Sequence, residues 1–120
     1  VSEIERTRQE QQAILQNASI GIAFTRDRVF LHANPRMEEI FGWPLGTMTG
    51  QSGAVVWCND EDYQRIGREA GPVLARGEAF ETESLMARRD GSTLWCRVRG
   101  RAVDRVHPAQ GGTIWIVEDI

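Results

Sequence analysis

Residues 86–100 read MARRDGSTLWCRVRG, and this stretch decides the fold because it predicts a β-hairpin with a defined register. An Asp-Gly pair between two runs of strand-forming residues is a strong local signal for a hairpin. If residues 89–91 form a three-residue loop, Gly91 takes the left-handed conformation that glycine adopts at little cost. Arg88 then pairs with Ser92.

This register brings opposite charges together on one face of the hairpin and small or apolar groups on the other. The predicted cross-strand pairs are Glu81 with Arg99, Glu83 with Arg97, Leu85 with Trp95, Thr82 with Val98, Ser84 with Cys96 and Met86 with Leu94. A two-residue loop would shift the pairing by one position and lose the charge matches, each of which contributes about 0.2 to 1 kcal/mol. We therefore favour the three-residue loop, which explains the arginines as part of a strand pair; an anion-binding site is the alternative.

Further strands are predicted on both sides of this hairpin. Its own strands run over 79–87 and 93–104, and a third follows over 112–119. Upstream, SIGIAFT (19–25) and RVFLHAN (28–34) are rich in β-branched and aromatic residues and form a second tight hairpin. Both upstream strands carry apolar residues on each face, so we expect both near the middle of a covered sheet.

Two helices are predicted between these strand groups. Asn34, followed by a proline, is an N-cap signal, and Gly42 stops the first helix. Asn59 caps the second helix, which Gly77 ends and which Gly71–Pro72 should kink or divide. Strands at both ends with helices between them predict an α+β fold, a five-stranded antiparallel sheet with helices gathered on one face.

The chain divides into a main domain over 18–120 and a polar segment over 1–17 that lacks glycine and proline. The polar segment favours an N-terminal flanking helix, either exposed or part of a coiled-coil contact. The chain has 120 residues, the usual size of one domain.

Composition and charge exclude several classes of function. The net charge of −3 argues against a nucleic-acid partner. Membrane contact is not expected, because no apolar run approaches the roughly 18 residues of a membrane span, and no signal peptide is visible. Cys58 and Cys96 lack the spacing of metal ligands or of a redox pair, so no metal is predicted and a reducing cytoplasm is favoured.

The sequence offers little for catalysis. Its aspartates fall at predicted turns and caps, its glutamates mostly on polar faces, and no Ser/His/Asp or Gly-rich phosphate arrangement occurs. We therefore predict no enzyme activity for this segment. A small α+β enzyme with a conical cavity, similar to the ketosteroid isomerase fold, is the alternative from another class.

Taken together, several motifs resemble the PAS sensory domain with its C-terminal PAC portion. The matching pieces, over residues 13–120, are ILQNASIGIAFT, ANPRMEEIFGW, EDYQRIGREAGPVLARGEAFETE, RRDGSTLWCRVRGRAV and GGTIWIVEDI. Each motif alone is weak, but their order and spacing together are specific. The resemblance implies the PAS fold and a role in signal transduction.

The resemblance also implies partners outside this segment. PAS domains of this kind regulate an output such as a histidine kinase of a two-component system or an enzyme of cyclic di-GMP signalling. The closing EDI is similar to the start of the family's Asp-Ile-Thr ending, so we expect this chain to be a piece of a longer protein. We also expect a homodimer through residues 1–17 and the outer face of the sheet.

No cofactor is assigned from the resemblance. Haem-binding relatives supply a histidine from the long helix, but residues 60–76 contain none, so haem is not expected. Light-sensing relatives carry an Asn-Cys-Arg-Phe segment that is absent from WCNDEDY (57–63). A flavin bound without an adduct stays open, with Trp43 and Trp57 as residues that could stack on its ring.

If a ligand is bound, we expect it to be small and largely apolar, held between the sheet and the helices. Candidate pocket residues are Ile22, Phe24, Phe41, Trp57, Ile66, Ser84, Met86, Leu94, Cys96 and Val98. Ser84 or Thr82 could supply a polar contact. A collapsed pocket is the alternative, and the domain would then act as a ligand-free dimerisation module.

Overall fold

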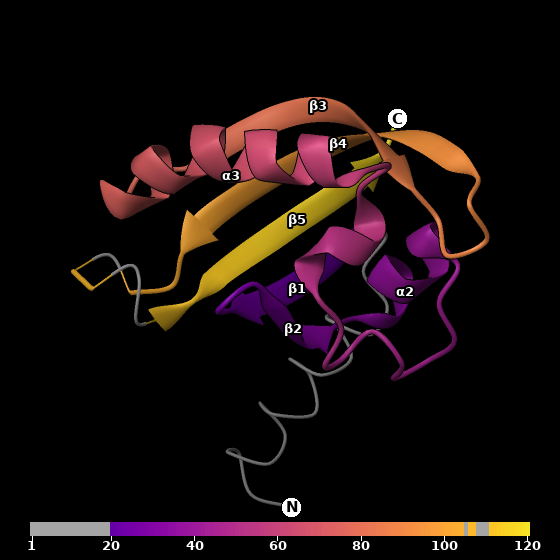
Figure 1. The fold of residues 1–120 in the computed structure, drawn as a ribbon. Helices are drawn as coiled ribbons and strands as arrows, with labels where there is room; N and C mark the ends of the chain where they lie inside the picture. The colour runs from indigo at the N-terminus through magenta and orange to yellow at the C-terminus, as the bar shows by residue number, and fades with distance from the viewer. Residues whose placement is uncertain (1–19, 105, 108–110) are drawn as a thin grey trace, which may run out of the picture.

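The structure, a computed structural model, describes residues 20–104, 106–107 and 111–120. Its strands are β1 Gly21–Arg26, β2 Val29–Ala33, β3 Phe80–Ala87, β4 Thr93–Ala102 and β5 Thr113–Asp119. Its helices are α2 Pro35–Phe41, the 3₁₀ helix η1 Gly53–Val56, and α3 Asp60–Ala75. The strands form one antiparallel sheet in the order β2-β1-β5-β4-β3, with the helices on one face (Figure 1). The predicted α+β class is confirmed, while the helix predicted over 1–17 lies outside the described residues.

The β3–β4 hairpin has the predicted register at every pair, from Glu81 opposite Arg99 to Met86 opposite Leu94. Arg88 N–H donates to the Ser92 carbonyl at 2.8 Å, and Gly91 has φ 89°, so the three-residue loop is confirmed. The Asp90 carboxylate accepts from the Ser92 amide at 2.9 Å. The Ser92 hydroxyl donates to the same carboxylate at 2.6 Å and is the main cause that holds the pKa of Asp90 below its ordinary value, and the bond from the Ser92 amide adds to it.

Charge pairing on the outer face of this hairpin is centred on Arg97. Its guanidinium lies 3.2 Å from the Glu83 carboxylate, 3.6 Å from Glu118 and 4.0 Å from Glu81. Strand register explains the set, because Glu83 and Glu118 are the direct neighbours of Arg97 on β3 and β5. Glu81 thus leans toward Arg97 rather than toward Arg99, its partner in the register.

The β1–β2 hairpin turns on two residues, Asp27 and Arg28, because Arg26 pairs directly with Val29. Both turn residues have positive φ, 52° and 62°, the pattern of the type I′ turn that matches the twist of a hairpin. Such a turn prefers glycine at its second central position. An arginine in this conformation is therefore strained.

The two upstream strands do not both lie inside the sheet. β1 is an interior strand between β2 and β5, as expected, but β2 is an edge strand. The prediction for β2 is therefore wrong. Its apolar residues are divided between a buried Phe30 on the core side and an exposed Leu31, and the register shifts by one residue near this point.

Side-chain caps start both α-helices where the sequence predicts. Asn34 Oδ1 accepts from Met37 N–H at 2.9 Å and also from Ile22 N–H at 2.9 Å, so it joins α2 to β1. Asn59 Oδ1 accepts from Asp62 N–H at 2.8 Å. Gly42 ends α2 in the left-handed conformation, with φ 71°.

α3 continues through Gly71 and Pro72 as one helix. The prediction that these residues could divide it is therefore not met. Pro72 lies in the last turn and is exposed, so the carbonyl that loses its helical donor there can be hydrated. Ile66 and Ala70 of this helix are buried.

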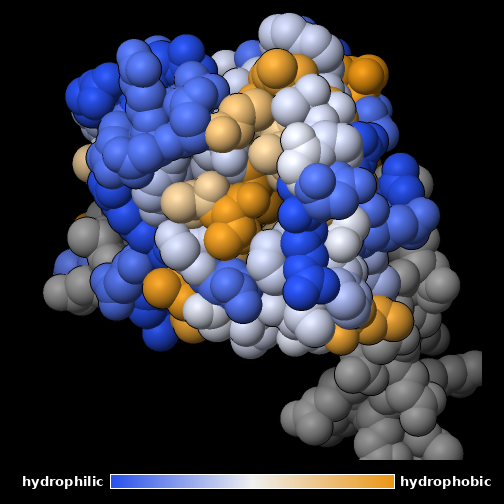
Figure 2. All heavy atoms as spheres, turned by 45° about the vertical axis from the view of Figure 1, so that its right-hand side comes forward, coloured by the Kyte–Doolittle hydropathy of each residue, from blue (hydrophilic) through white to orange (hydrophobic). Residues whose placement is uncertain are grey.

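The core lies between the helices and the inner face of the sheet. β4 alternates strictly, with Leu94, Cys96 and Val98 buried and the residues between them exposed. Met37, Phe41 and Met48 close the core from the helical side. On the face that Figure 2 shows, hydrophobic residues gather in a patch framed by hydrophilic ones.

Candidate functional site

A cavity of about 380 Å³ lies between α3, η1 and the inner face of the sheet. Its apolar and aromatic lining residues are Phe30, Met37, Val56, Trp57, Tyr63, Ile66, Ala70, Leu74, Ala75, Met86, Val98, Trp115 and Val117. Its other lining residues are Thr25, Arg26, Asp27, Arg28, Gly53, Gly67, Gly71, Gly112 and Thr113. The size falls in the range of small-molecule pockets, and the lining is predominantly apolar, as in such sites.

The sheet wall is fixed by Trp115. Its indole Nε1–H donates to Thr25 Oγ1 at 3.0 Å, and this bond joins two neighbouring strands inside the cavity wall. The ring lies over Gly100 on β4, where a Cβ would come 2.5 Å from it. The missing side chain at Gly100 thus makes room for the aromatic wall.

The helical wall comes from α3 and from the segment around η1. Ile66 and Ala70, one turn apart on α3, are buried and face the sheet. Trp57 follows η1 and forms an isolated bridge with Met86, which fixes the η1 segment against β3. Tyr63 lies nearer the start of α3 and brings a phenol to the cavity.

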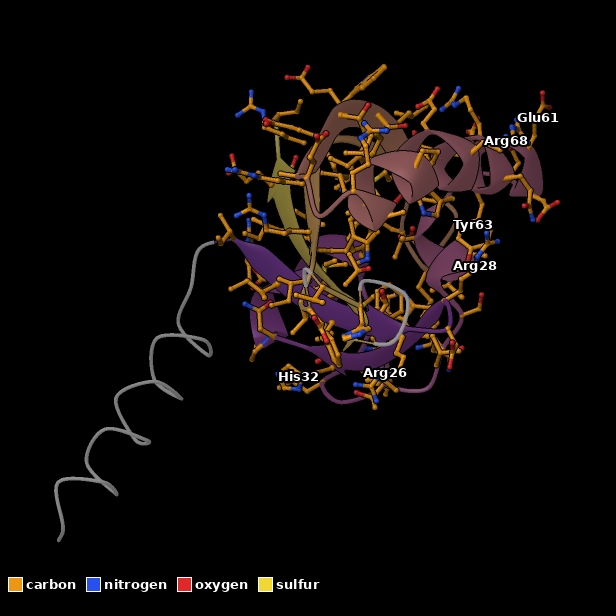
Figure 3. The ribbon with its side chains drawn as sticks, turned by 90° about the vertical axis from the view of Figure 1, so that its left-hand side faces the viewer. Arg26, Arg28, His32, Glu61, Tyr63 and Arg68 are labelled. Atoms are coloured by element: carbon orange, nitrogen blue, oxygen red, sulfur yellow. The ribbon has the colours of Figure 1, made fainter. Side chains whose placement is uncertain are left out.

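The charged residues of the cavity lining come from one side, the β1–β2 turn. The β1–β2 turn brings Arg26, Asp27 and Arg28 to the lining. Arg28 reaches toward Tyr63 of α3 (Figure 3), with its guanidinium carbon 5.7 Å from the ring centroid. Arg26 instead lies over Phe24, at 5.6 Å.

Four of the ten predicted pocket residues line the cavity: Trp57, Ile66, Met86 and Val98. Another four are buried between the sheet and the helices but do not line it: Phe41, Ser84, Leu94 and Cys96. The two residues suggested for polar contacts, Ser84 and Thr82, donate to backbone carbonyls of their own strand and lie outside the lining.

Ile22 and Phe24 were predicted to line the pocket, but they lie on the opposite face of the sheet. Their neighbours Ala23 and Thr25 face inward, the first buried in the core and the second in the cavity wall. Side chains of a strand alternate between faces, so the prediction was displaced by one residue. A Cβ added at Gly21 would come 3.1 Å from the Met37 sulfur, which shows why the inward positions of β1 are small.

Most of the cavity lining was not predicted from the sequence, and Thr25, Tyr63 and Trp115 are three examples. Tyr63 carried a usable signal, because it lies three residues before Ile66, a predicted pocket residue, and so on the same face of the helix. Trp115 and Thr25 carried no such signal, because whether they line the cavity depends on which face of β5 and of β1 points toward the helices. Arg28 was missed because turn residues are expected at the surface.

The histidines and cysteines lie away from the cavity. His32 pairs with Phe24 on the outer side of the sheet, and His107 lies 3.5 Å from the Asp104 carboxylate. Cys58 is exposed and Cys96 is buried. Among the described residues, no three His, Cys, Asp or Glu side chains are grouped to hold a metal ion.

Comparison with known proteins agrees with this geometry. A family model described as the PAS fold matches residues 15–120. The sensor protein TdiS of Thauera aromatica is 35% identical over 109 residues, which cover 91% of this chain and 20% of TdiS. The chain therefore spans about a fifth of the length of that relative.

Solved structures show the same similarity. A PAS domain of a LuxR-family transcriptional regulator from Burkholderia thailandensis, in complex with ethanol, is 30% identical with a TM-score of 0.82. The match covers 91% of this chain and 96% of that one. A PAS domain from Colwellia psychrerythraea has a TM-score of 0.83 at 18% identity, covering 98% of both chains, and shows the common fold. Family match, fold and cavity together place this chain in the PAS family.

Proposed function

We propose that this PAS domain is a sensory module that binds a small, largely apolar molecule in its cavity and thereby regulates an output domain. The role is sensory rather than catalytic. The observation that carries the proposal is the cavity itself, because about 380 Å³ between sheet and helices is lined mainly by apolar and aromatic side chains. A related PAS domain, 30% identical, has been solved in complex with ethanol, another small molecule.

The output domain lies outside this segment. TdiS is a sensor protein and this chain matches only 20% of it, so a regulated partner domain in the same protein is the natural arrangement. A histidine kinase or an enzyme of cyclic di-GMP signalling would fit. We place the domain in the cytoplasm. None of the helices in the described part of the chain is long and apolar enough to cross a membrane.

Signal transfer requires that the ligand bind two conformations with different affinity, since equal affinity shifts no equilibrium. We propose that the outer face of the sheet transmits the signal, through contact with the N-terminal segment or with a second copy of the chain. Large apolar side chains are exposed there: Trp95 is 57% exposed and Ile114 42%. A ligand-free module that acts only by dimerising through this face is the second candidate.

Native mass spectrometry and analysis of the small molecules released on denaturation test ligand binding directly. A stoichiometric released compound supports the sensor. A domain that is empty after purification, and dimeric by light scattering, supports the ligand-free module.

A cavity-filling variant sharpens this test. Ala70→Phe should place a ring in the cavity and abolish retention of the released compound, because Ala70 is buried in the cavity wall. Arg68→Phe adds the same ring to the exposed side of α3 and is the matched control. Unchanged retention by a folded Ala70→Phe domain would locate the ligand elsewhere.

A further inference from the structure

Arg28 occupies a backbone position at which another residue would be less strained. It is the second central residue of the β1–β2 turn, with φ 62°, where a type I′ turn favours glycine. Strained backbone conformations cluster at functional sites, and they persist only where the surrounding structure enforces them. The carbonyl of Arg28 accepts from Gly53 N–H at 2.8 Å, so the turn is tied to the start of η1, which also lines the cavity.

The Arg28 side chain is held against α3. Its guanidinium lies over the Tyr63 ring, and a Cβ at Gly67 would come 3.3 Å from its Nη2 atom. Glycine at 67 therefore leaves the space that the guanidinium uses. All three residues line the cavity, and Arg28 is exposed to water, so the positive charge lies at the mouth, where the cavity meets solvent.

The charge of Arg28 is not matched within the described part of the protein. No described carboxylate lies within ion-pair distance of Arg28, whereas Arg36, Arg65, Arg76 and Arg97 each pair with at least one. Arg26, the other cation at the mouth, rests on Phe24, which belongs to the outer face of the sheet. Arg28 is thus the cation best placed to meet a molecule inside the cavity.

We propose that the cavity takes a small aromatic carboxylate, whose ring lies among the apolar residues and whose acid group binds the Arg28 guanidinium. This inference rests on the proposed ligand-sensing function and names its ligand class. Aromatic side chains from both walls, Phe30, Trp57, Tyr63 and Trp115, suit the ring. The acid group stays at the mouth, where Arg28 is exposed to water, and the planar guanidinium can bind it through two parallel hydrogen bonds.

Asp27 opposes this interaction. It also lines the mouth, beside Arg28, and its negative charge would repel an entering carboxylate. Replacing Asp27 by asparagine, which tolerates a positive φ, should therefore strengthen the binding of a carboxylate and leave that of a neutral analogue unchanged.

Isothermal titration with matched acid and amide pairs tests the proposal. The probes are benzoate and benzamide, 4-methylbenzoate and 4-methylbenzamide, and phenylacetate and phenylacetamide, titrated into the domain freed of any bound molecule. We expect at least one acid to bind about tenfold or more tightly than its amide, as a charge-assisted pair allows. Arg28→Gln should remove that preference, Arg28→Lys should keep part of it, and Arg68→Gln, the same charge change on the exposed side of α3, should keep all of it.

The outcomes separate this proposal from the broader one. Amides that bind as well as the acids, or an acid preference that survives in Arg28→Gln, would overturn the role of Arg28 while ligand sensing stands. If neither acids nor amides bind, the ligand class proposed here is wrong. The small molecules released from the natively purified domain then decide separately whether it senses a ligand at all.

Discussion

The indole ring of Trp115 lies across Gly100 on the neighbouring strand, in the space where another residue would carry its side chain. The two residues are direct partners in the β4–β5 register. Because Trp115 also donates a hydrogen bond to Thr25, its ring cannot turn away without losing that bond. A single glycine thereby sets the position of one cavity wall.

Replacing Gly100 by alanine should destabilise the domain by about 1 to 3 kcal/mol, because the added methyl group overlaps the Trp115 ring. Urea unfolding measures this loss. In a Trp115→Leu background the overlapping ring is absent. Gly100→Ala should therefore lower the free energy of unfolding less in that background than in the parent protein. A Gly100→Ala domain as stable as the parent would show that the ring can move freely.

Glu38 is a buried carboxylate that holds the loop after α2. It is only 3% exposed, and its two oxygens accept from Gly46 N–H at 2.9 Å and Met48 N–H at 3.1 Å. Glu38→Ala should cost about 1 to 3 kcal/mol, since two backbone donors lose their partner. Glu39→Ala is the control, because that side chain is exposed in a surface ion pair with Arg36, and it should change the free energy of unfolding by less than about 1 kcal/mol. Equal losses in the two variants would contradict the anchoring role of Glu38.

The β3–β4 hairpin could be predicted residue by residue because its information is local. The loop glycine and the alternating charges of Glu81, Glu83 and Arg97 all indicate the same register. A shift by one residue would lose both the loop conformation and the charge pairs. Helix starts were predictable for the same reason, since Asn34 and Asn59 each cap an amide only three residues away.

The inward face of β1 could not be predicted, because the deciding contacts come from elsewhere in the chain. Local hydrophobicity favours Ile22 and Phe24, the larger side chains. Yet Met37 and Ile40 of α2 fill the space beside Gly21, so only small residues fit on that side. The burial of Glu38 could not be predicted either, because its hydrogen-bond donors belong to a loop without a regular sequence pattern.

Cys96 should make the stability of the domain pH-dependent in alkaline solution. Burial is the main cause that raises the pKa of its thiol to about 11, with a further contribution from the Asp119 charge. The unfolded thiol ionises near the ordinary value of 9.0, so the stabilising contribution is complete below pH 9 and is lost as pH rises toward 11. The free energy of unfolding, measured from pH 8 to 11, should decline less for Cys96→Ala than for the parent protein.

The two thiols also predict a difference in reactivity. Cys58 is exposed, and its pKa is raised by partial burial and by the Asp62 charge. A thiol reagent should therefore modify Cys58 in the native domain, faster as pH increases, and reach Cys96 only on unfolding. Rapid native labelling of a Cys58→Ser variant would contradict the burial of Cys96.

Arg28→Gly should stabilise the ligand-free domain even though it removes side-chain contacts. Glycine adopts the positive φ of this turn position at little cost, and relief of strain of order 1 kcal/mol or more exceeds an exposed contact between a cation and a ring, of about 0.5 to 1 kcal/mol. Arg26→Gly is the control and should destabilise, because that residue lies in β1, where glycine weakens a strand. Urea unfolding of both variants tests the sign. A loss of stability in Arg28→Gly would mean that the guanidinium contributes more to the fold than its backbone strain costs, so its presence would need no ligand to explain it.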